Sequence, residues 1–563
     1  MAFQLSPGVQ VTEKDLTSVV PAVGASIGGT AGIFAWGPSE EITTVSSENE
    51  LVATFGKPPK TDNRSWFAAA SFLAYTDTLK VVRAINSASL NATSGVGAVA
   101  GTGELIKNNT DYENNHSSGA ADGSDGMFAA KWAGARGNSL KVSFADSSDY
   151  AAWTYKGEFD YAPSVTAFGA DQGATVDEMH IIVIDEDGEF TGTAGTVLEK
   201  FAGVSKASNA IDSVGRSNYY KNVLNNRSRY IWWTSHPAAT NNWGSVGAGT
   251  TFDSSHVAAE STTSLAGGAD GTIADADKQT AFLLFSNDEE VDVNLVFTGD
   301  ASATVSEYVV DFVAEVRKDL MVFISPVAES VIENANPANA IKTEIDTFTT
   351  RSSYAVFDSG WKYMYNRYYD EYLYVPCNGD TAGLCANTDT VADPWFSPAG
   401  FNRGTIKNIV RLAYSPKKSD RDTLYQAGVN PIVGFPGNGI VLFGDKTMLA
   451  KPSAFDRINV RRLFIVMEKA IATAAKFQMF EFNDAFTRAQ FKNLVEPFLR
   501  DVQGRRGLYD FRVICDGSNN TTQVVDTNNF VADIFVQPAK SINFIQLNFV
   551  ATRTGISFEE VGA

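Results

Sequence analysis

The chain has 563 residues, which predicts two to four domains because a single hydrophobic core rarely serves so long a chain. Apolar residues make up 44% and charged residues 20%, proportions that exclude wholesale disorder. The formal charge is −20, and so acidic a chain repels phosphate backbones. The charge therefore argues against nucleic acid as the main partner.

Residues 1–23 predict an extended arm. Val9 and Val11 alternate with polar residues after the break at Pro7-Gly8, which is the period of a strand with one apolar face. No nearby segment completes a hairpin, so we expect this strand to pair with a sheet edge in its own chain or in another. The arm lacks a basic region followed by an apolar run, so it does not have the pattern of a signal peptide.

The next region, residues 24–271, reads as β-rich. It opens on a segment rich in glycine, where we expect a turn, followed by a helix with Asp62 as N-cap and a strand. Between residues 87 and 126 small and polar residues dominate, which predicts a loop-rich surface insertion or a small peripheral domain without a core of its own. The elements expected in this region are a helix over 64–75, strands over 79–86, 139–144, 179–185 and 230–234, a hairpin turn at Asp187-Gly188 and a helix over 198–212.

Strand and helix patterns alternate in residues 272–455. A strand over 291–297 is followed by a helix over 306–319 and by a buried strand over 320–326 that ends at its proline. Residues 354–376 are aromatic-rich and resemble strands. This alternation predicts helices packed on a sheet.

The last region, residues 456–563, begins with the strongest helix pattern in the chain, over 456–477. Its apolar stripe is Val460, Phe464, Met467, Ile471 and Ala474, and we expect it to pack in a core. A second helix is expected over 484–503 and strands over 530–538 and 541–552. The final strand places Ile545, Leu547 and Phe549 on one face, so the chain begins and ends in strand sequence.

Charge is unevenly distributed along the chain. Residues 400–512 hold 19 Lys and Arg but only 10 Asp and Glu, whereas the remainder holds 26 basic and 55 acidic residues. This basic segment could bind an acidic partner or an acidic patch on a sister subunit, or it could be a solvated face without a partner.

Two segments imitate catalytic or nucleotide-binding motifs. Gly24–Gly28 matches the G-x-S-x-G nucleophile elbow around Ser26, but glycines follow it where a helix is required. The segment 439–447 resembles a phosphate-binding loop with one residue too many, although IVLF reads as a buried strand and Asp445 would repel phosphate.

The sequence also gives only weak signals for metal-binding sites and reactive cysteines. Residues 185–188 suggest a calcium loop, but Phe190 and Thr196 stand where glycine and glutamate are needed, which favours a hairpin turn. The four histidines are scattered, as expected of surface residues in turns. Three cysteines indicate reduced thiols, although Cys377 and Cys385 are close enough in sequence to bridge. We predict no catalytic, cofactor-binding or metal-binding residue, and no stretch of about 18 apolar residues that would span a membrane.

Several segments in chain order resemble the tail sheath proteins of contractile-tailed bacteriophages of the myovirus type. The matching segments are LSPGVQVTEKD (5–15), GIFAWGP (32–38), LVATFGKPP (51–59), LAGGADG (265–271), GNGIVLFGDKT (437–447), INVRRLFIVMEKAI (458–471), FEFND (480–484) and INFIQLNFVATRTG (542–555). No single segment is specific to the family, but the same segments in the same order are. The insertion at 87–126 departs from the family pattern.

The resemblance implies an α+β multidomain fold with outward β-rich domains inserted and a mixed α/β C-terminal core domain that exchanges its terminal strands. The implied domains are an arm (1–23), an outer region (24–271), a middle α/β domain (272–455) and a tube-contacting C-terminal domain (456–563). Strand exchange between subunits would involve Val9, Val11, Ile545, Leu547 and Phe549. The tube-facing basic residues would be Arg457, Arg461, Arg462, Lys469 and Lys476.

The resemblance also implies a function. Sheath subunits form stacked hexameric rings around a tail tube, between a baseplate and a tail terminator, and contract without ATP to drive the tube through the host envelope. Such a chain is assembled in the host cytoplasm, works in the virion, needs no cofactor and binds no membrane.

Three alternatives remain open from the sequence. The chain could be the sheath of a phage-derived contractile injection system of the bacteriocin type. It could be a multidomain hydrolase that uses Ser26, because catalytic triads need not cluster in sequence. It could also be an acidic binding module, which would remain monomeric at high concentration.

Overall fold

The computed structural model describes residues 24–95, 100–117, 126–147, 149–174, 176–235, 262–543 and 546. The chain divides into a large unit, Gly24–Asp393 with Pro398–Ile458, and a C-terminal unit that combines Pro394–Ser397 with the residues from Asn459 onward. The strand residues predicted at Val9, Val11, Ile545, Leu547 and Phe549 lie outside the described residues, as does the arm.

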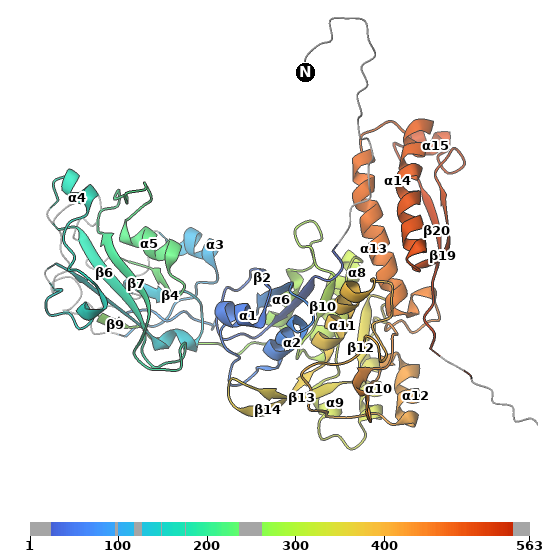
Figure 1. The fold of residues 1–563 in the computed structure, drawn as a ribbon, viewed down its shortest axis with the longest axis horizontal. Coiled ribbons are helices and arrows are strands. Elements are labelled where there is room, and N and C mark those ends of the chain that lie inside the picture. The colour runs from blue at the N-terminus through green and yellow to red at the C-terminus, as the bar shows by residue number, and fades with distance from the viewer. Residues whose placement is uncertain are drawn as a thin grey trace, which may run out of the picture. The chain divides into compact units, whose positions relative to one another are not determined.

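A seven-stranded sheet forms the core of the large unit (Figure 1). The strand order is β16-β12-β11-β10-β1-β3-β2, and every neighbouring pair is parallel except β2 with β3. The strands are β1 (Gly28–Gly32), β2 (Thr43–Val45), β3 (Leu79–Arg83), β10 (Leu295–Phe297), β11 (Met321–Ile324), β12 (Ala355–Asp358) and β16 (Val429–Asn430). The sheet thus joins strands from 24–86 with strands from 272–455, two ranges that the sequence assigned to different domains.

Strand β1 begins at Gly28, at the end of the segment 24–28 where the sequence predicted a glycine-rich turn, and residues 24–27 before it are irregular. A Cβ atom on Gly28 would lie 2.3 Å from the Phe72 ring, and one on Gly29 would lie 2.8 Å from Val293 Cγ2. Side chains from neighbouring segments therefore pack directly on the strand backbone, which only glycine permits.

Helices pack around this sheet, as the alternating pattern predicted. The expected helix over 64–75 is confirmed as α2, although Asn63 and not Asp62 precedes it and no side chain caps it. The expected helix over 306–319 is confirmed, with a π-helical segment, η4, in its middle. The helices are α1 (Glu48–Phe55), α2 (Arg64–Leu73), α6 (Asp275–Leu283), α7 (Ala303–Val309), η4 (Val310–Ala314), α8 (Glu315–Arg317), α9 (Ala328–Val331), α10 (Pro337–Thr347), α11 (Asn378–Val391) and α12 (Lys418–Ala427).

Two small antiparallel sheets complete the large unit's central part. One has the order β14-β13-β15 and the other pairs β17 with β18. Their strands are β13 (Trp361–Asn366), β14 (Glu371–Pro376), β15 (Arg411–Leu412), β17 (Ile432–Phe435) and β18 (Gly439–Leu442). The strands expected in the aromatic segment 354–376 are thereby confirmed.

Between β3 and β10 the chain leaves the sheet and forms an inserted lobe, residues 87–271. Its core lies on an antiparallel sheet of order β7-β6-β5-β9, and a second pair joins β4 to β8. The elements are α3 (Asn109–Asp111), β4 (Phe128–Ala130), β5 (Leu140–Asp146), α4 (Ala167–Asp171), β6 (Glu178–Asp185), β7 (Thr196–Ser205), α5 (Tyr220–Arg227), β8 (Ile231–Trp233) and β9 (Thr262–Ser264). The strands expected over 139–144, 179–185 and 230–234 are confirmed.

Strand β7 replaces the helix predicted over 198–212. Two irregularities in its pairing with β6, between Met179 and Ile181 and between Val183 and Ile184, insert extra residues into the strand. These bulges bring Phe201 and Val204, three residues apart, into the same core, so the strand imitates helical spacing.

The insertion predicted at 87–126 is not a simple surface loop where the structure describes it. Ser89, Asn91 and Thr93 are fully buried, and Leu90 and Thr93 form bridges with Ala269 and Ala266. Tyr112 stacks on Trp232 with ring centroids 4.1 Å apart. This part of the insertion therefore shares the core of the lobe.

The C-terminal unit packs two long helices and a two-stranded sheet around one core. Helices α13 (Ile458–Ala475) and α14 (Ala485–Gly504) confirm both predicted helices, and β20 (Asp533–Pro538) confirms the strand expected over 530–538. Strand β19 (Leu508–Ile514) and the short helix α15 (Thr522–Asp526) complete the unit. Met467 of the predicted stripe lies in the core with Leu463 and Leu499.

The close packing on β1 predicts that Gly28→Ala destabilises the large unit by about 1–3 kcal/mol, because the added methyl group overlaps the Phe72 ring. Calorimetric unfolding of the purified chain measures this loss. Gly157→Ala is the matched control, because a Cβ there meets nothing within 4 Å. Equal melting curves for the two variants would contradict this account of β1.

Candidate assembly interface

The sheet of the C-terminal unit has open edges. Strands β19 and β20 pair with each other from Leu508–Pro538 to Ile514–Asp533, and no third strand joins them among the described residues. Ile534 and Val536 face the core with α14, whereas Phe535 points away and is exposed. A two-stranded sheet is marginal by itself, and its outer N–H and C=O groups can bind a further strand on either side.

The predicted basic residues do not form a single exposed face. Arg461 and Arg462 are only 7% and 3% exposed, whereas a tube-facing role requires accessible side chains. The reason is that α13 is buried on more than its predicted stripe, with Leu463 and Ile465 also in the interior. Lys469 is half-buried and Lys476 is exposed.

Arg457 lies just before α13, and its guanidinium contacts other side chains of the large unit. Its guanidinium lies 3.2 Å from Asp445 Oδ1 and donates a hydrogen bond to the Tyr425 hydroxyl. The Tyr425 hydroxyl and the carboxylates of Asp445 and Asp456 raise the pKa of Arg457 against the effect of its burial. Arg457 is therefore part of a local charge cluster.

The basic segment predicted at 400–512 is divided between the two units. Residues 400–458 carry 9 basic and 4 acidic side chains, and residues 459–512 carry 10 and 6. Residues 459–563 together carry 12 basic and 11 acidic side chains, so the C-terminal segment is nearly neutral.

The two segments that imitate enzyme motifs have other structural roles. Ser26 precedes β1 and no helix follows it, so it lacks the strand–turn–helix geometry of a nucleophile elbow. Gly439 begins β18, which pairs with β17 as the buried-strand interpretation predicted.

Asp185 and His180 are structural residues of the lobe. The carboxylate of Asp185 accepts hydrogen bonds from the backbone of Gly188, Phe190 and Thr191, which fixes the turn between β6 and β7 as the hairpin interpretation predicted. His180 is fully buried and stacks on Phe159, so the expectation of surface histidines is wrong for this residue. No group of residues in the described ranges has the arrangement of a metal site.

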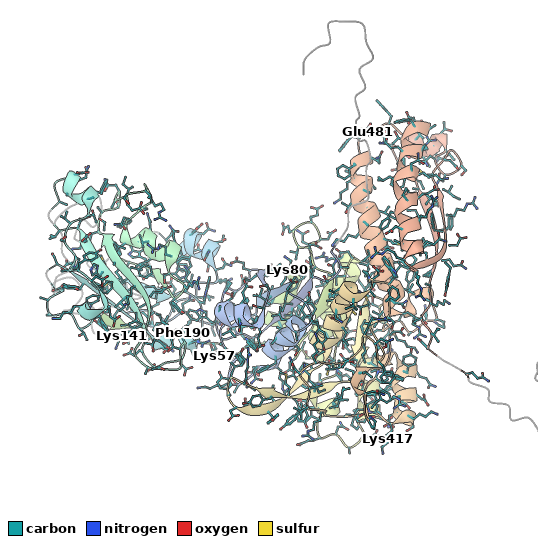
Figure 2. All side chains as sticks on the ribbon, viewed as in Figure 1. Lys57, Lys80, Lys141, Phe190, Lys417 and Glu481 are labelled. Atoms are coloured by element: carbon teal, nitrogen blue, oxygen red, sulfur yellow. The ribbon has the colours of Figure 1, made fainter. Side chains whose placement is uncertain are left out.

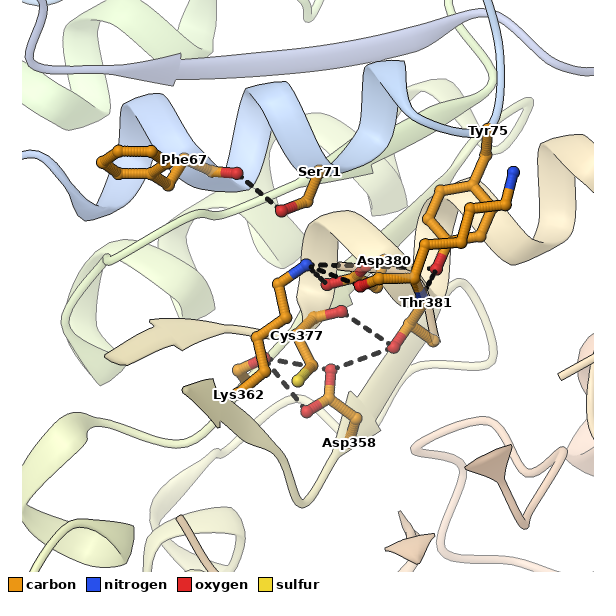
Figure 3. Close-up of polar contacts among 10 residues, drawn as sticks. Phe67, Ser71, Tyr75, Asp358, Lys362, Cys377, Asp380 and Thr381 are labelled. Atoms are coloured by element: carbon orange, nitrogen blue, oxygen red, sulfur yellow. Dashed lines mark hydrogen bonds and ion pairs between the residues drawn. The ribbon is translucent and has the colours of Figure 1, made fainter. Parts of the chain in front are cut away.

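A buried polar cluster lies at the carboxyl edge of the parallel sheet (Figure 3). Lys362 Nζ lies 2.9 Å and 2.8 Å from the two carboxylate oxygens of Asp380, and both side chains are fully buried. The Tyr75 hydroxyl donates a further bond of 3.1 Å to Asp380. Burial raises the pKa of Asp380, and the neighbouring ammonium of Lys362 opposes this shift.

Asp358 ends β12 beside this pair. It accepts hydrogen bonds from Ser325, Thr381 and the Gly360 N–H, yet burial raises the pKa of Asp358 to about 7. Open α/β sheets bind ligands at this edge. Here the first turn of α11 and the side chain of Lys362 occupy it, so the cluster stabilises the fold.

Two further expectations concern disulfide bonds and membrane-spanning helices. Cys377, Cys385 and Cys515 are buried and unbridged, which excludes the local disulfide considered from the sequence. In the described ranges no helix combines the length and apolar character needed to cross a bilayer.

Family models and curated relatives both match this chain. Residues 272–448 match the family model of the phage tail sheath protein central domain, and residues 450–552 match that of the phage tail sheath C-terminal domain. The chain is 33% identical to the tail sheath protein of Vibrio phage KVP40, with 99% of each chain covered. It is 30% identical to the tail sheath protein of Enterobacteria phage T4, again over 99% of each chain.

A solved structure shares the fold. The contracted helical sheath of the anti-feeding prophage matches with a TM-score of 0.50 at 12% identity, covering 98% of this chain and 100% of that chain. This likeness supports a mixed α/β multidomain fold of the kind predicted.

The buried pair predicts that Lys362→Met destabilises the large unit by about 3–5 kcal/mol, because it leaves the Asp380 carboxylate without its counter-ion. Lys342→Met, which removes an exposed pair with Asp346, should cost less than about 1 kcal/mol. Adding Asp380→Leu to Lys362→Met should recover part of the loss. Calorimetry of the three variants measures these differences, and equal effects of the two single changes would refute the buried pair's role.

Proposed function

The chain belongs to the phage tail sheath protein family, and from this premise we propose that it polymerises as stacked hexameric rings around a tail tube and contracts. The relatives that span the whole chain are tail sheath proteins of phages, and a fold neighbour is a helical sheath in its contracted state. Its place is the phage tail, built in the host cytoplasm between a baseplate and a tail terminator. That fold neighbour belongs to the anti-feeding prophage, so the alternative is a phage-derived contractile injection system.

The β19–β20 sheet, which no third strand joins in the part of the chain that the structure describes, is the observation that carries this proposal. Its two edges offer backbone donors and acceptors to strands from neighbouring copies. Val9 and Val11 of one copy and Ile545, Leu547 and Phe549 of another have the alternating pattern of such strands. Because each copy would give strands in one direction and receive them in the other, the contact is heterologous, and it generates rings and helical assemblies instead of closed dimers.

Contraction then follows from a change in packing between rigid subunits. The extended sheath would be metastable on the tube, and release at the baseplate would let subunits rotate into a wider lattice with more mutual contact. A few kcal/mol per subunit, summed over many subunits, would suffice without nucleotide hydrolysis. The exchanged strands would remain paired and act as hinges.

The tube contact needs a smaller set of residues than the sequence indicated. Arg461 and Arg462 are buried, Arg457 and Lys469 are half-buried, and Lys476 is exposed. Arg457 belongs to the charge cluster with Asp445 in the large unit, whereas Lys469 and Lys476 lie in the C-terminal unit. We assign these two lysines to an electrostatic contact with the tube.

Deleting residues 1–20 tests strand exchange. The truncated chain should remain a folded monomer, because the cores of both units lie in the described residues, but it should form no tubes in negative-stain microscopy. Val9→Asp with Val11→Asp should act like the deletion, whereas Gln10→Asp with Thr12→Asp on the opposite face should polymerise. Tubes formed by the truncated chain would show that the arm is dispensable.

Reversing the charge of Lys469 and Lys476 to Glu tests the tube contact. The double variant should lose roughly tenfold in affinity for assembled tubes, with the difference shrinking at high salt, while the chain still polymerises alone. Lys60→Glu with Lys342→Glu changes the net charge equally at exposed sites of the large unit and is the matched control. Co-sedimentation with tubes measures both variants, and the assignment fails if they bind alike.

A further inference from the structure

The turn between α13 and α14 presents an exposed apolar surface, which we call the apolar tip. Its members are Phe477, Met479, Phe480, Phe482 and Phe486, each at least 59% exposed. The tip surrounds Glu481, which Figure 2 labels at this end of the C-terminal unit. Scattered exposed apolar residues are normal, but five within ten positions form a patch.

Hydrogen bonds hold the tip rigid. Asn483 Nδ2 donates to the Asn529 carbonyl at 2.7 Å, and the Arg488 guanidinium donates to both the side chain and the carbonyl of Asn483 at 2.7 Å and 2.9 Å. Asp484 caps α14 by accepting from the Thr487 N–H at 2.8 Å. These hydrogen bonds connect the α14 end of the tip to the rest of the C-terminal unit.

The backbone of the tip is itself strained. Phe480 has φ +70°, in the left-handed region that residues other than glycine rarely adopt, and its side chain is fully exposed. Among the described residues, no packing on the Phe480 side chain offsets the cost of this conformation.

The size of the tip matches a protein interface. A phenylalanine or methionine side chain offers up to about 200 Å², so the five side chains expose roughly 800 Å² of largely apolar surface. This exceeds the usual largest patch on a monomer and equals about one partner's share of a stable interface.

Two observations favour a second copy of this chain as the occupant. Asn483 attaches the tip to residues 520–529, the segment that leads into β20, where we propose that a neighbouring copy adds its strand. In addition, residues 459–563 are nearly neutral, so copies can approach through this segment without strong charge repulsion.

Contraction disfavours the tube as the occupant. A sheath that widens must leave the tube, and an apolar contact of this size would have to be exposed to water again in every subunit. A contact between copies can persist through the change or form during it.

We propose that the apolar tip docks on a second copy of this chain, adjacent to the strand-exchange edge of β20. The inference rests on the proposed function, because it requires a polymer of this chain. It adds to strand exchange an apolar contact made by side chains.

The test is the double variant Phe480→Ser with Phe482→Ser in the full-length chain. Its critical concentration for polymerisation, measured by light scattering and negative-stain microscopy without any tube, should rise at least tenfold over wild type. Its melting temperature should stay unchanged, because both side chains are exposed. Val214→Ser, at an exposed apolar residue in a turn of the lobe, should polymerise as wild type does.

Each outcome decides the proposal. A double variant that polymerises like wild type overturns it, and if that variant also loses co-sedimentation with tail tubes, the tip belongs to the tube contact. A wild-type chain that stays monomeric at every concentration overturns the proposed function as well as the tip contact. If the wild type polymerises and the critical concentration of the double variant is at least tenfold higher, the result supports both the proposed function and the tip contact.

Discussion

Backbone hydrogen bonding at the edges of the β19–β20 sheet is the constraint on which the proposed function depends. A strand edge is a row of donors and acceptors at fixed spacing, so it binds another strand in register and in one of few directions. Side-chain contacts between two subunits break when the subunits slide past each other. A strand that is hydrogen-bonded to a neighbouring sheet moves together with that sheet. An edge contact therefore suits an assembly whose subunits must rotate without separating.

The large unit differs from the sheet edges, because its interior is closely packed and its buried charges are paired. Side chains pack on the glycines of β1, and α11 approaches α2 so closely that a Cβ on Gly379 would lie 2.3 Å from the Ala68 carbonyl oxygen. The Lys362–Asp380 pair is stable only while its geometry is kept, since each charge is buried. In the proposed assembly, packing between copies would change at the sheet edges and at the apolar tip, outside this interior.

Sequence patterns predicted the elements that carry a helical apolar stripe or a continuous apolar run. The stripe of α13 and the apolar runs of β5 and β6 belong to this class, and the structure confirms them. Helix α11 was missed because Gly379, Gly383 and its other small residues look like a loop, whereas they allow close packing on α2 and Tyr75. Burial of Arg461 and Arg462 and the open edges of β19–β20 depend on tertiary packing, which has no periodic signal in the sequence.

The acidic charge and the exposed apolar tip lie in different parts of the chain. Residues 459–563 carry almost no net charge, so the rest of the sequence, with 33 basic and 54 acidic residues, carries a net charge of −21. Like charge there disfavours non-specific contact between copies and keeps free subunits apart. In the proposed assembly, contact through the neutral C-terminal segment avoids that repulsion, and there the strand edges would set the direction of the contact while the apolar tip would add buried surface. Growth by addition of copies through this segment is then favoured over collapse of copies through the acidic one.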